Sequence, residues 1–358
     1  MTDPVRVGFL GIGYIAERAH LPALQPMVNS GEVVLQAFCD IDEKALVERA
    51  TAFSVTATYT DFTKMLADQP LDALYVCLPP TLHTDQVKLA ADQGIHMFVE
   101  KPVSLDLAQA LNFADAIEHA GVVSQVGFNS RYYPSSPVVK ELVAQRTPRH
   151  AHINRWYSGS PIRWWTSRYE ECGGSFVENT IHTVDLLRYF LGDVADVSAF
   201  YQWRQPGEGP EPMNLPHVYT VNYRFESGVV ANATISRVLN DAGGADRSEV
   251  IIVCDDALIE WNPTSVVENG EVVWELGNNE ENNSSAHQAR GFISAVQAGN
   301  PSLTRSPYGP SLNSLAAVIG ANASAERDGA LLSLPSLLAG EVSWNPRAVV
   351  GQGLPALE

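Results

Sequence analysis

The stretch Gly11–Ala16 constrains the fold most strongly, because it joins an apolar run to a segment of helical composition. The run Val5–Leu10 is short and apolar, as in a buried strand, and residues 17–24 follow as a helix. Glycines in such a turn let the backbone approach a pyrophosphate at a helix N-terminus. The pattern also occurs as a sharp turn in α/β proteins that bind no nucleotide. The predicted cofactor-binding residues of this loop are Gly11, Gly13, Tyr14, Ile15 and Ala16.

Strands and helices alternate through the first third of the chain. Segments of helical composition separate five apolar, β-rich runs. Such alternation predicts an α/β domain with a parallel sheet that helices cover on both faces. The strand candidates are 5–10, 33–39, 71–78, 95–99 and 122–128.

Beyond residue 130 strands follow strands. This predicts a large, mostly antiparallel, open-faced sheet, with helices at 286–298 and 312–327 and an irregular tail from Gly340. We therefore expect a Rossmann-type domain at 1–126 and an α+β domain for substrate binding and oligomerisation at 127–358. The strand candidates are 150–157, 197–203, 218–225, 229–236, 249–253, 257–261 and 272–276.

Asp40 ends the second predicted strand, where a carboxylate accepts hydrogen bonds from the adenine ribose. A 2′-phosphate there would face Asp40, with Asp42 and Glu43 close behind, and like charges repel. No arginine follows directly, and Lys44 is the nearest base. The sequence thus favours NAD over NADP as the cofactor.

Composition excludes several classes of protein. Lys and Arg number 23 against 41 Asp and Glu, a net charge of −18, whereas proteins that bind nucleic acids or anionic membranes need basic surfaces. The four cysteines are scattered singly, so neither a disulfide framework nor a metal site is expected. No signal peptide precedes the first strand and no apolar stretch is long enough to span a bilayer, so we expect a cytoplasmic protein.

Two further strings, Glu100-Lys101-Pro102 and Glu171–Asp185 (ECGGSFVENTIHTVD), complete a pattern that, with the glycine loop, resembles the Gfo/Idh/MocA family. These are oxidoreductases of the glucose–fructose oxidoreductase and inositol dehydrogenase type. The resemblance covers nearly the whole chain. It implies NAD(P)-dependent oxidation or reduction of a sugar, cyclitol or related polyol, in a homodimer or homotetramer.

The resemblance also extends to two shorter strings. Pro79, Pro80 and His83 match the string that lines the nicotinamide side, and 127–132, with Arg131, matches the domain junction. One departure is Glu178, where the family commonly has Asp four residues before the catalytic His. A longer carboxylate changes the preferred substrate shape and leaves the reaction type unaffected.

Lys101 stands between a strand end and a proline, which restricts its backbone. An ammonium held there can hydrogen-bond the substrate oxygen and stabilise developing alkoxide charge. A solvated surface lysine is the ordinary alternative, and the resemblance decides for a catalytic and cofactor-contacting role. Glu100 is expected to bind the nicotinamide ribose.

The segment 175–191 has a helical pattern in which Glu178, His182, Asp185 and Tyr189 form one polar stripe. A carboxylate beside an imidazole favours the charged imidazole, which suits a general base near neutrality. We predict His182 as the base and Glu178 as its partner or a substrate ligand. A satisfied core histidine is the alternative, and Asp185 and Tyr189 are assigned structural roles.

Arg155-Trp156-Tyr157 and Arg163-Trp164-Trp165 flank a Gly/Pro/Ser loop. Arginine and aromatic faces suit sugar rings, although tryptophans are equally ordinary core residues. The predicted substrate-binding residues are Lys101, Arg131, Arg163, Trp164, Glu178 and His182. The prediction is a dehydrogenase; the alternative is a non-catalytic NAD-binding sensor on the same fold.

Overall fold

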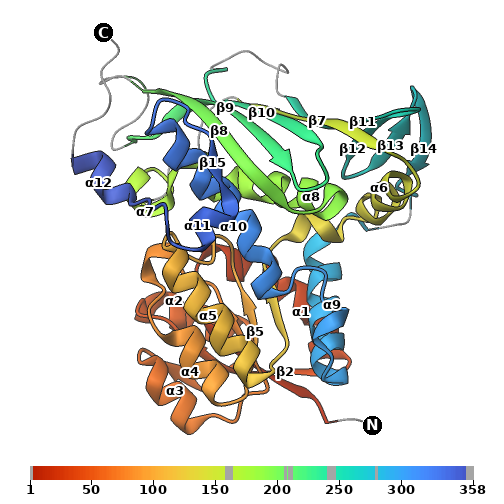
Figure 1. Cartoon of the computed structure of the whole chain (residues 1–358). Helices are drawn as coiled ribbons and strands as arrows, with labels where there is room; N and C mark the ends of the chain where they lie inside the picture. The colour runs from red at the N-terminus through yellow and green to blue at the C-terminus, as the bar shows by residue number, and fades with distance from the viewer. Residues whose placement is uncertain are drawn as a thin grey trace. The chain divides into compact units, whose positions relative to one another are not determined.

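The computed structural model describes residues 3–157, 164–204, 208, 213–239, 247–278 and 281–351. The chain forms two compact units, each built from several segments (Figure 1). Unit 1 comprises Met1–Val103, Gln109–Tyr132 and Asn283–Ser311. Unit 2 comprises Ser104–Ala108, Tyr133–Asn282 and Leu312–Glu358.

Unit 1 contains a six-stranded parallel sheet in the order β3-β2-β1-β4-β5-β6. This is the dinucleotide-binding order, with its switch point between β1 and β4, and it confirms the predicted Rossmann-type sheet. β3 escapes sequence analysis because it has only two residues. The strands are β1 (Val5–Leu10), β2 (Val33–Cys39), β3 (Thr58–Tyr59), β4 (Ala73–Val76), β5 (His96–Val99) and β6 (Ser124–Val126).

The helices of unit 1 connect these strands, and one of them comes from far along the chain. α9 lies beside α1 although more than 250 residues separate them (Figure 1). The helical elements are η1 (Ala16–His20), α1 (Leu21–Asn29), α2 (Glu43–Ala52), α3 (Phe62–Asp68), η2 (Pro80–Leu82), α4 (Gln86–Asp92), α5 (Leu107–Ala120), η3 (Asn129–Tyr132), α9 (Ser284–Ala298) and η5 (Pro301–Leu303).

Aromatic packing explains why α9 belongs to unit 1. Tyr75 stacks between Phe9 and Phe98 on adjacent strands, with ring centroids 4.8 and 4.6 Å away. Phe292 of α9 meets Tyr75 edge-on at 5.6 Å, and the Gln288 side chain donates to the carbonyl of Val126. The segment 283–311, which the sequence places in the second domain, is therefore part of unit 1, because its apolar face completes this core.

Unit 2 contains a nine-stranded sheet in the order β14-β13-β12-β11-β7-β10-β9-β8-β15. Within the described strands, β7 and β10 pair in parallel and all other neighbours are antiparallel, which confirms the mostly antiparallel prediction. The strands are β7 (Pro148–Trp156), β8 (Val194–Trp203), β9 (Pro216–Phe225), β10 (Val230–Ser236), β11 (Arg247–Cys254), β12 (Leu258–Asn262), β13 (Ser265–Glu268), β14 (Glu271–Glu275) and β15 (Leu332–Ser333).

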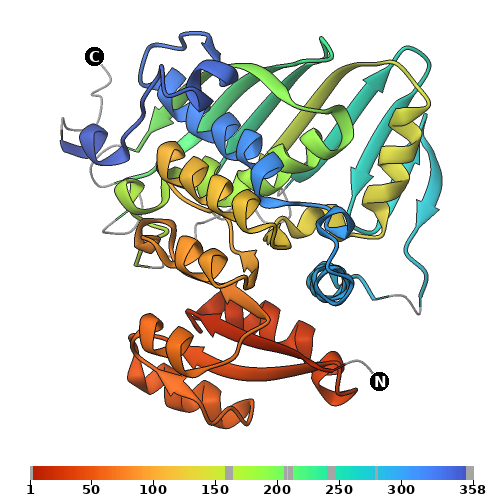
Figure 2. The ribbon, with the colours of Figure 1, turned by 60° about the horizontal axis from the view of Figure 1, so that its bottom comes forward.

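Helices cover one face of this sheet (Figure 2). The Tyr201 hydroxyl on β8 donates to Asn322 of α10, and Tyr223 on β9 donates to the carbonyl of Ala317. α12 lies in the tail from Gly340 that the sequence predicts to be irregular, so that prediction is wrong. The helical elements are α6 (Ser135–Ala144), α7 (Tyr169–Cys172), η4 (Phe176–Thr180), α8 (Ile181–Leu191), α10 (Tyr308–Ala325), α11 (Leu334–Leu338) and α12 (Pro346–Gly351).

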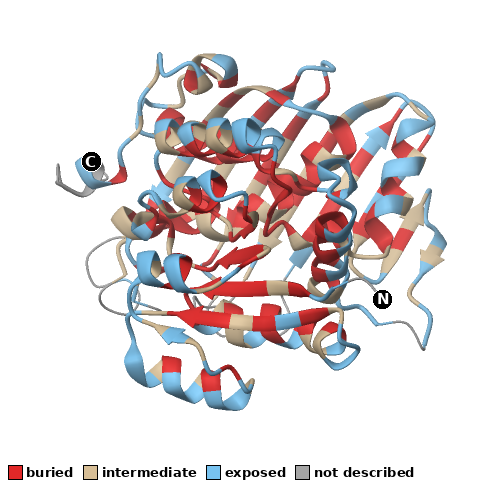
Figure 3. Cartoon of the chain, turned by 90° about the horizontal axis from the view of Figure 1, so that it is seen from below, coloured by how far each residue is buried: buried red, intermediate tan, exposed pale blue. Residues whose placement is uncertain are grey.

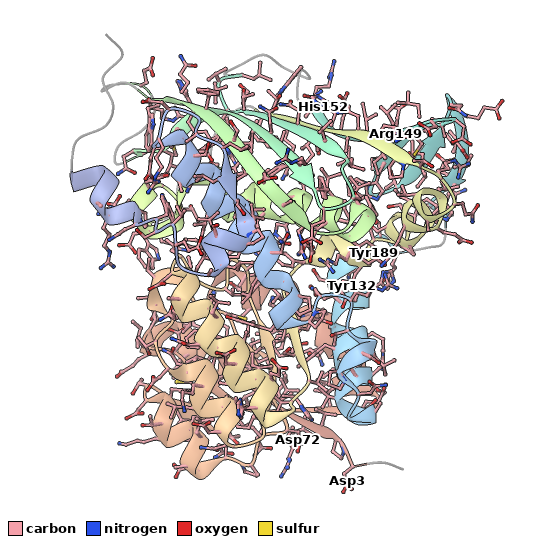
Figure 4. The ribbon with its side chains drawn as sticks, viewed as in Figure 1. Asp3, Asp72, Tyr132, Arg149, His152 and Tyr189 are labelled. Carbon is pink, nitrogen blue, oxygen red and sulfur yellow. The ribbon has the colours of Figure 1, made fainter. Side chains whose placement is uncertain are left out.

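The opposite face of the sheet, called the open face here, carries no helix among the described residues. Strand residues alternate between buried and exposed positions, as the burial colours of Figure 3 show. Phe200, Asn222 and Arg224 lie exposed on the open face. In Figure 4, His152 of β7 lies on this side, whereas Tyr189 of α8 lies on the helix-covered side.

Candidate functional site

Different physical reasons explain why positions 11 and 13, in the loop after β1, are glycine. Gly11 has a φ of +82°, and a Cβ there would lie 2.7 Å from the carbonyl oxygen of Cys77. The fold itself therefore requires glycine at position 11. Gly13 has no positive φ, and a Cβ there would meet nothing within 4 Å. Packing therefore does not explain Gly13, whereas a ligand close to the backbone does.

Asp40 lies directly against this loop. One carboxylate oxygen accepts the backbone N–H of Ile12 at 2.8 Å, and the other accepts that of Asp42 at 2.9 Å. A carboxylate has about four lone-pair sites, so both oxygens can also accept ribose hydroxyls. The loop thus holds its acid at the carboxyl end of β2, where the adenosine half of a dinucleotide binds in this topology.

The other predicted loop residues divide between solvent and core. Tyr14 is 54% exposed, whereas Ala16 is fully buried and Ile15 packs against the same core cluster. Helical structure begins at Tyr14, so the backbone N–H groups of the first turn are available to a phosphate. Ile15 and Ala16 can therefore contact a cofactor through their backbone, while their side chains stabilise the unit.

Pro79, Pro80 and His83 lie at and after the end of β4. Pro80 begins η2, and the His83 ring is buried with Nε2 3.4 Å from the carbonyl oxygen of Leu78. Burial lowers the pKa of His83 from 6.5 to about 4. Nδ1 of His83 has no hydrogen-bond partner among the described residues. The imidazole is therefore neutral near pH 7.

Glu100 supports the backbone at Lys101. Its buried carboxylate accepts the backbone N–H of Lys101 at 3.0 Å, and its other oxygen lies 2.7 Å from Nε2 of His20. A Cβ at Gly127 would lie 2.6 Å from that carboxylate, so Gly127 makes room for it. The sequence offered no signal for His20, since a single histidine in a helix predicts nothing. The ribose contact expected of Glu100 remains a prediction.

Arg131 is buried within unit 1. Its guanidinium donates to the carbonyl of Arg305 at 2.5 Å, and Arg305 donates to the carbonyl of Arg131 at 2.9 Å. This reciprocal pair joins η3 to the segment after α9. The substrate contact expected of Arg131 remains untested beside this structural role.

In unit 2, the predicted helix begins with a π-helical turn, η4, before α8. The regular helical pattern that the sequence predicts over 175–191 is therefore interrupted at Glu178. Glu178 and His182 are nevertheless partly exposed on an otherwise largely buried segment. π-helical turns are rare and frequently lie at functional sites.

Two other members of the stripe have structural contacts. The buried Asp185 carboxylate accepts the hydroxyl of Ser314 at 2.6 Å, and Nζ of Lys140 lies 4.0 Å from the ring centroid of Tyr189. Gly173 and Gly174, which precede η4, both have positive φ, and a Cβ at Gly174 would lie 3.1 Å from the ring of Tyr169. Backbone conformation and packing therefore both favour glycine at this turn.

The residues around the predicted sugar-binding loop differ in exposure and in contacts. Arg163 lies outside the described residues. Trp164 is 63% exposed, whereas Trp165 packs against a core cluster that contains Tyr169 and Trp203. Arg155 on β7 donates to the hydroxyl of Thr183 at 3.2 Å. Arg155 therefore contacts α8 at the residue next to His182.

Other features of the described residues narrow the chemistry. No group of three or more His, Cys, Asp or Glu side chains among them is placed to hold a metal ion. None of their helices is long and apolar enough to cross a membrane. All four cysteines are buried and unpaired, and burial raises the pKa of the Cys39 thiol to about 12. Cys39 is therefore protonated at neutral pH.

Residues 5–128 match the model of an oxidoreductase family with an NAD-binding Rossmann fold, and residues 140–260 match the GFO/IDH/MocA C-terminal domain. The chain belongs to the GFO/IDH/MocA oxidoreductase family. The first match spans β1 to β6, and the second spans β7 to β11 and most of β12. The resemblance seen in the glycine loop, the EKP string and the helix after Gly174 is thereby confirmed.

Relatives within this family include named dehydrogenases. The chain is 28% identical to the uncharacterized oxidoreductase YrbE of Bacillus subtilis over 66% of this chain and 68% of the relative. It is 31% identical to myo-inositol 2-dehydrogenase of Thermotoga maritima, over 53% of this chain and 55% of that enzyme. A crystal structure of a Thermotoga maritima oxidoreductase superposes with a TM-score of 0.81 at 22% identity, covering 93% of this chain and 99% of the other. This likeness supports the fold.

Proposed function

We propose that this family member is an NAD-dependent dehydrogenase that transfers a hydride between a sugar, cyclitol or related polyol and the nicotinamide. The observation that carries the proposal is the loop after β1, where Gly13 leaves the backbone open beside the carboxylate of Asp40. The named relative that oxidises myo-inositol supports the substrate class. NAD, when bound, exchanges the hydride with the substrate carbon.

The chain's own residues would then deprotonate and hydrogen-bond the substrate hydroxyl. His182 takes the hydroxyl proton as general base, and Glu178 orients His182 or binds the substrate. Lys101 donates a hydrogen bond to the same oxygen and stabilises negative charge as it develops. The hydrogen bond from the backbone N–H of Lys101 to the Glu100 carboxylate fixes the backbone just after β5, where the lysine lies. Trp164, partly exposed, remains a candidate for a sugar face.

A panel of polyols tests this proposal. The wild-type chain is incubated with NAD and, in turn, myo-inositol, aldoses and sugar acids, and the absorbance of reduced cofactor is followed. At least one member should be oxidised, and Lys101→Ala should lower its kcat about 100-fold or more because the lost donor acts on developing charge. Lys88→Ala is the matched control, since Lys88 is exposed and pairs with Asp92.

Two outcomes would contradict the proposal. NAD binding without turnover of any polyol favours a non-catalytic NAD sensor. Loss of NAD binding in Lys101→Ala assigns the lysine to the cofactor and not to the chemistry. Calorimetric titration with NAD separates these two outcomes.

We also propose that the open face of the nine-stranded sheet pairs with a second copy of the chain. Helices cover one face of the sheet, and the other exposes apolar side chains such as Phe200 and Val230. Analytical ultracentrifugation at micromolar concentration should give a dimer or tetramer, and Phe200→Glu should weaken it. A wild-type monomer would contradict this assignment.

A further inference from the structure

At the end of two neighbouring strands of unit 2, the last residue that faces the helix-covered side is an arginine. On β7 the buried residues Ala151 and Ile153 precede Arg155 at the same alternation, and on β10 Ala233 and Ile235 precede Arg237. In the parallel ladder Ile235 is opposite Arg155, so Arg237 follows at the same end of the sheet. Both arginines therefore belong to the helix-covered face.

One aromatic ring joins the two guanidinium groups. The guanidinium carbon of Arg155 lies 5.0 Å from the ring centroid of Tyr157, and that of Arg237 lies 5.4 Å from it. Arg237 is only 8% exposed. Two cations thus share one ring at a site where Arg155 also contacts Thr183, the neighbour of His182.

The guanidinium groups are not fully satisfied by the described residues. The Nε atoms of Arg155, Arg237 and the nearby Arg204 are buried and have no hydrogen-bond partner among the described residues. A buried donor left without an acceptor is destabilising, more so when it is charged. Burial lowers the pKa of Arg155, and the charge of Arg237 lowers it further. A ligand that accepts these donors would relieve both effects.

The described acidic groups nearby leave these Nε donors without an acceptor. Glu178 attracts Arg155, and Glu208 attracts Arg204 and lies 4.0 Å from Nδ1 of His217. Neither carboxylate accepts a hydrogen bond from an Nε of the cluster. Guanidinium forks match the planar, paired oxygens of carboxylates and phosphates better than single hydroxyls.

We propose that Arg155 and Arg237, assisted by Arg204, bind an oxyanion group of the substrate, which is therefore an acidic or phosphorylated sugar or cyclitol rather than a neutral one. This inference rests on the proposed function and narrows its substrate class. The group recognised is a carboxylate or a phosphate. The cluster contacts α8 beside His182, so the anion would lie in unit 2 near the predicted base.

Matched substrates test the inference first. D-Glucose, D-galactose and D-mannose are compared with their uronates and their 6-phosphates, with NAD in excess. We expect at least one anionic member to exceed its neutral parent about 100-fold in kcat/KM, and the uronate and phosphate arms distinguish the two anions. Equal or better turnover of the neutral parents would overturn the inference while leaving the proposed function intact.

Variants then assign the effect to the cluster. Arg237→Gln should reduce the preference for the anionic member roughly 10- to 100-fold, because a charge-assisted fork is lost. Arg237→Lys should keep part of it. Arg149→Gln is the matched control, since Arg149 is exposed and pairs with Asp255. An equal loss for anionic and neutral substrates would assign Arg237 a structural role.

Binding without turnover separates the two proposals. The thermal unfolding midpoint of the wild-type chain is measured with D-glucuronate, D-glucose 6-phosphate, inorganic phosphate or D-glucose. An upward shift with an anion and none with D-glucose, lost in Arg237→Gln, supports the inference even if no sugar is oxidised, and then the proposed function alone fails. No shift with any anion, together with no anionic preference in turnover, overturns the inference, and this wild-type result stands even if Arg237→Gln does not fold.

Discussion

The two regions that carry the proposed function are built differently. At the carboxyl end of the unit 1 sheet, the acids are already bonded to the protein: Asp40 accepts two backbone N–H groups, and Glu100 holds the backbone of Lys101. In unit 2, Arg155 and Arg237 retain buried donors without acceptors among the described residues. The two acids of the cofactor region are thus partnered before a ligand arrives, whereas the Nε atoms of Arg155 and Arg237 have no acceptor among the described residues. Individual substrate preference is therefore expected to reside in unit 2.

The largest expected effect tests the catalytic assignment in unit 2. His182→Ala should lower kcat roughly 100- to 10,000-fold, the range that a general base contributes, while NAD binding survives because the loop after β1 is untouched. Steady-state kinetics and NAD titration measure the two quantities. His119→Ala, at an exposed position of α5, is the control. Near-wild-type kcat in His182→Ala would show that another group is the base.

The two glycines of unit 1 should separate folding from binding. Gly11→Ala places a side chain at a residue with positive φ, which lowers the unfolding free energy by about 1–2 kcal/mol. The new Cβ would also clash with the carbonyl of Cys77. Gly13→Ala meets no neighbour, so its unfolding free energy should change by less than about 0.5 kcal/mol while NAD binding weakens about tenfold or more. Denaturant unfolding and NAD titration measure these effects. Unchanged NAD affinity in Gly13→Ala would remove the main support for the cofactor site.

Asp40 should set the cofactor preference. The wild-type chain should favour NAD over NADP in kcat/KM, because a 2′-phosphate would lie against the Asp40 carboxylate. Asp40→Asn removes that charge and should narrow the preference about tenfold. Asp92→Asn, which breaks an exposed pair with Lys88, should leave it unchanged. A wild-type preference for NADP contradicts the assignment.

The smallest expected effect is the acid sensitivity of unit 1. His83 has a pKa of about 4 in the folded chain against 6.5 when unfolded, so the unfolded state binds more protons between these values. Its contribution to stability is complete above about pH 6.5 and is lost as the pH falls toward 4. Near pH 5.5 this loss is about 1.4 kcal/mol. His83→Gln should show a correspondingly shallower decline in unfolding free energy between pH 7 and 5.5, and His119→Gln should not.

Local patterns were enough to predict much of this protein. The apolar run before Gly11 predicts β1 with its correct bounds, and strand–helix alternation predicts the parallel sheet. The glycine loop and Asp40 were also found from sequence, because backbone turns and strand ends depend on neighbouring residues. Alternation along β7 and β10 is also a sequence signal that places Arg155 and Arg237 on the buried face.

Tertiary structure decided the rest, because the relevant contacts join residues far apart in the chain. The membership of α9 in unit 1 depends on Phe292 meeting Tyr75, and the role of Glu100 depends on His20. The same holds for Gly174, where a Cβ would lie 3.2 Å from the hydroxyl of Tyr219. Sequence determines which groups are available and which way a strand presents them. Only packing determines which of those groups find a partner and which, such as the Nε atoms of Arg155 and Arg237, have none among the described residues.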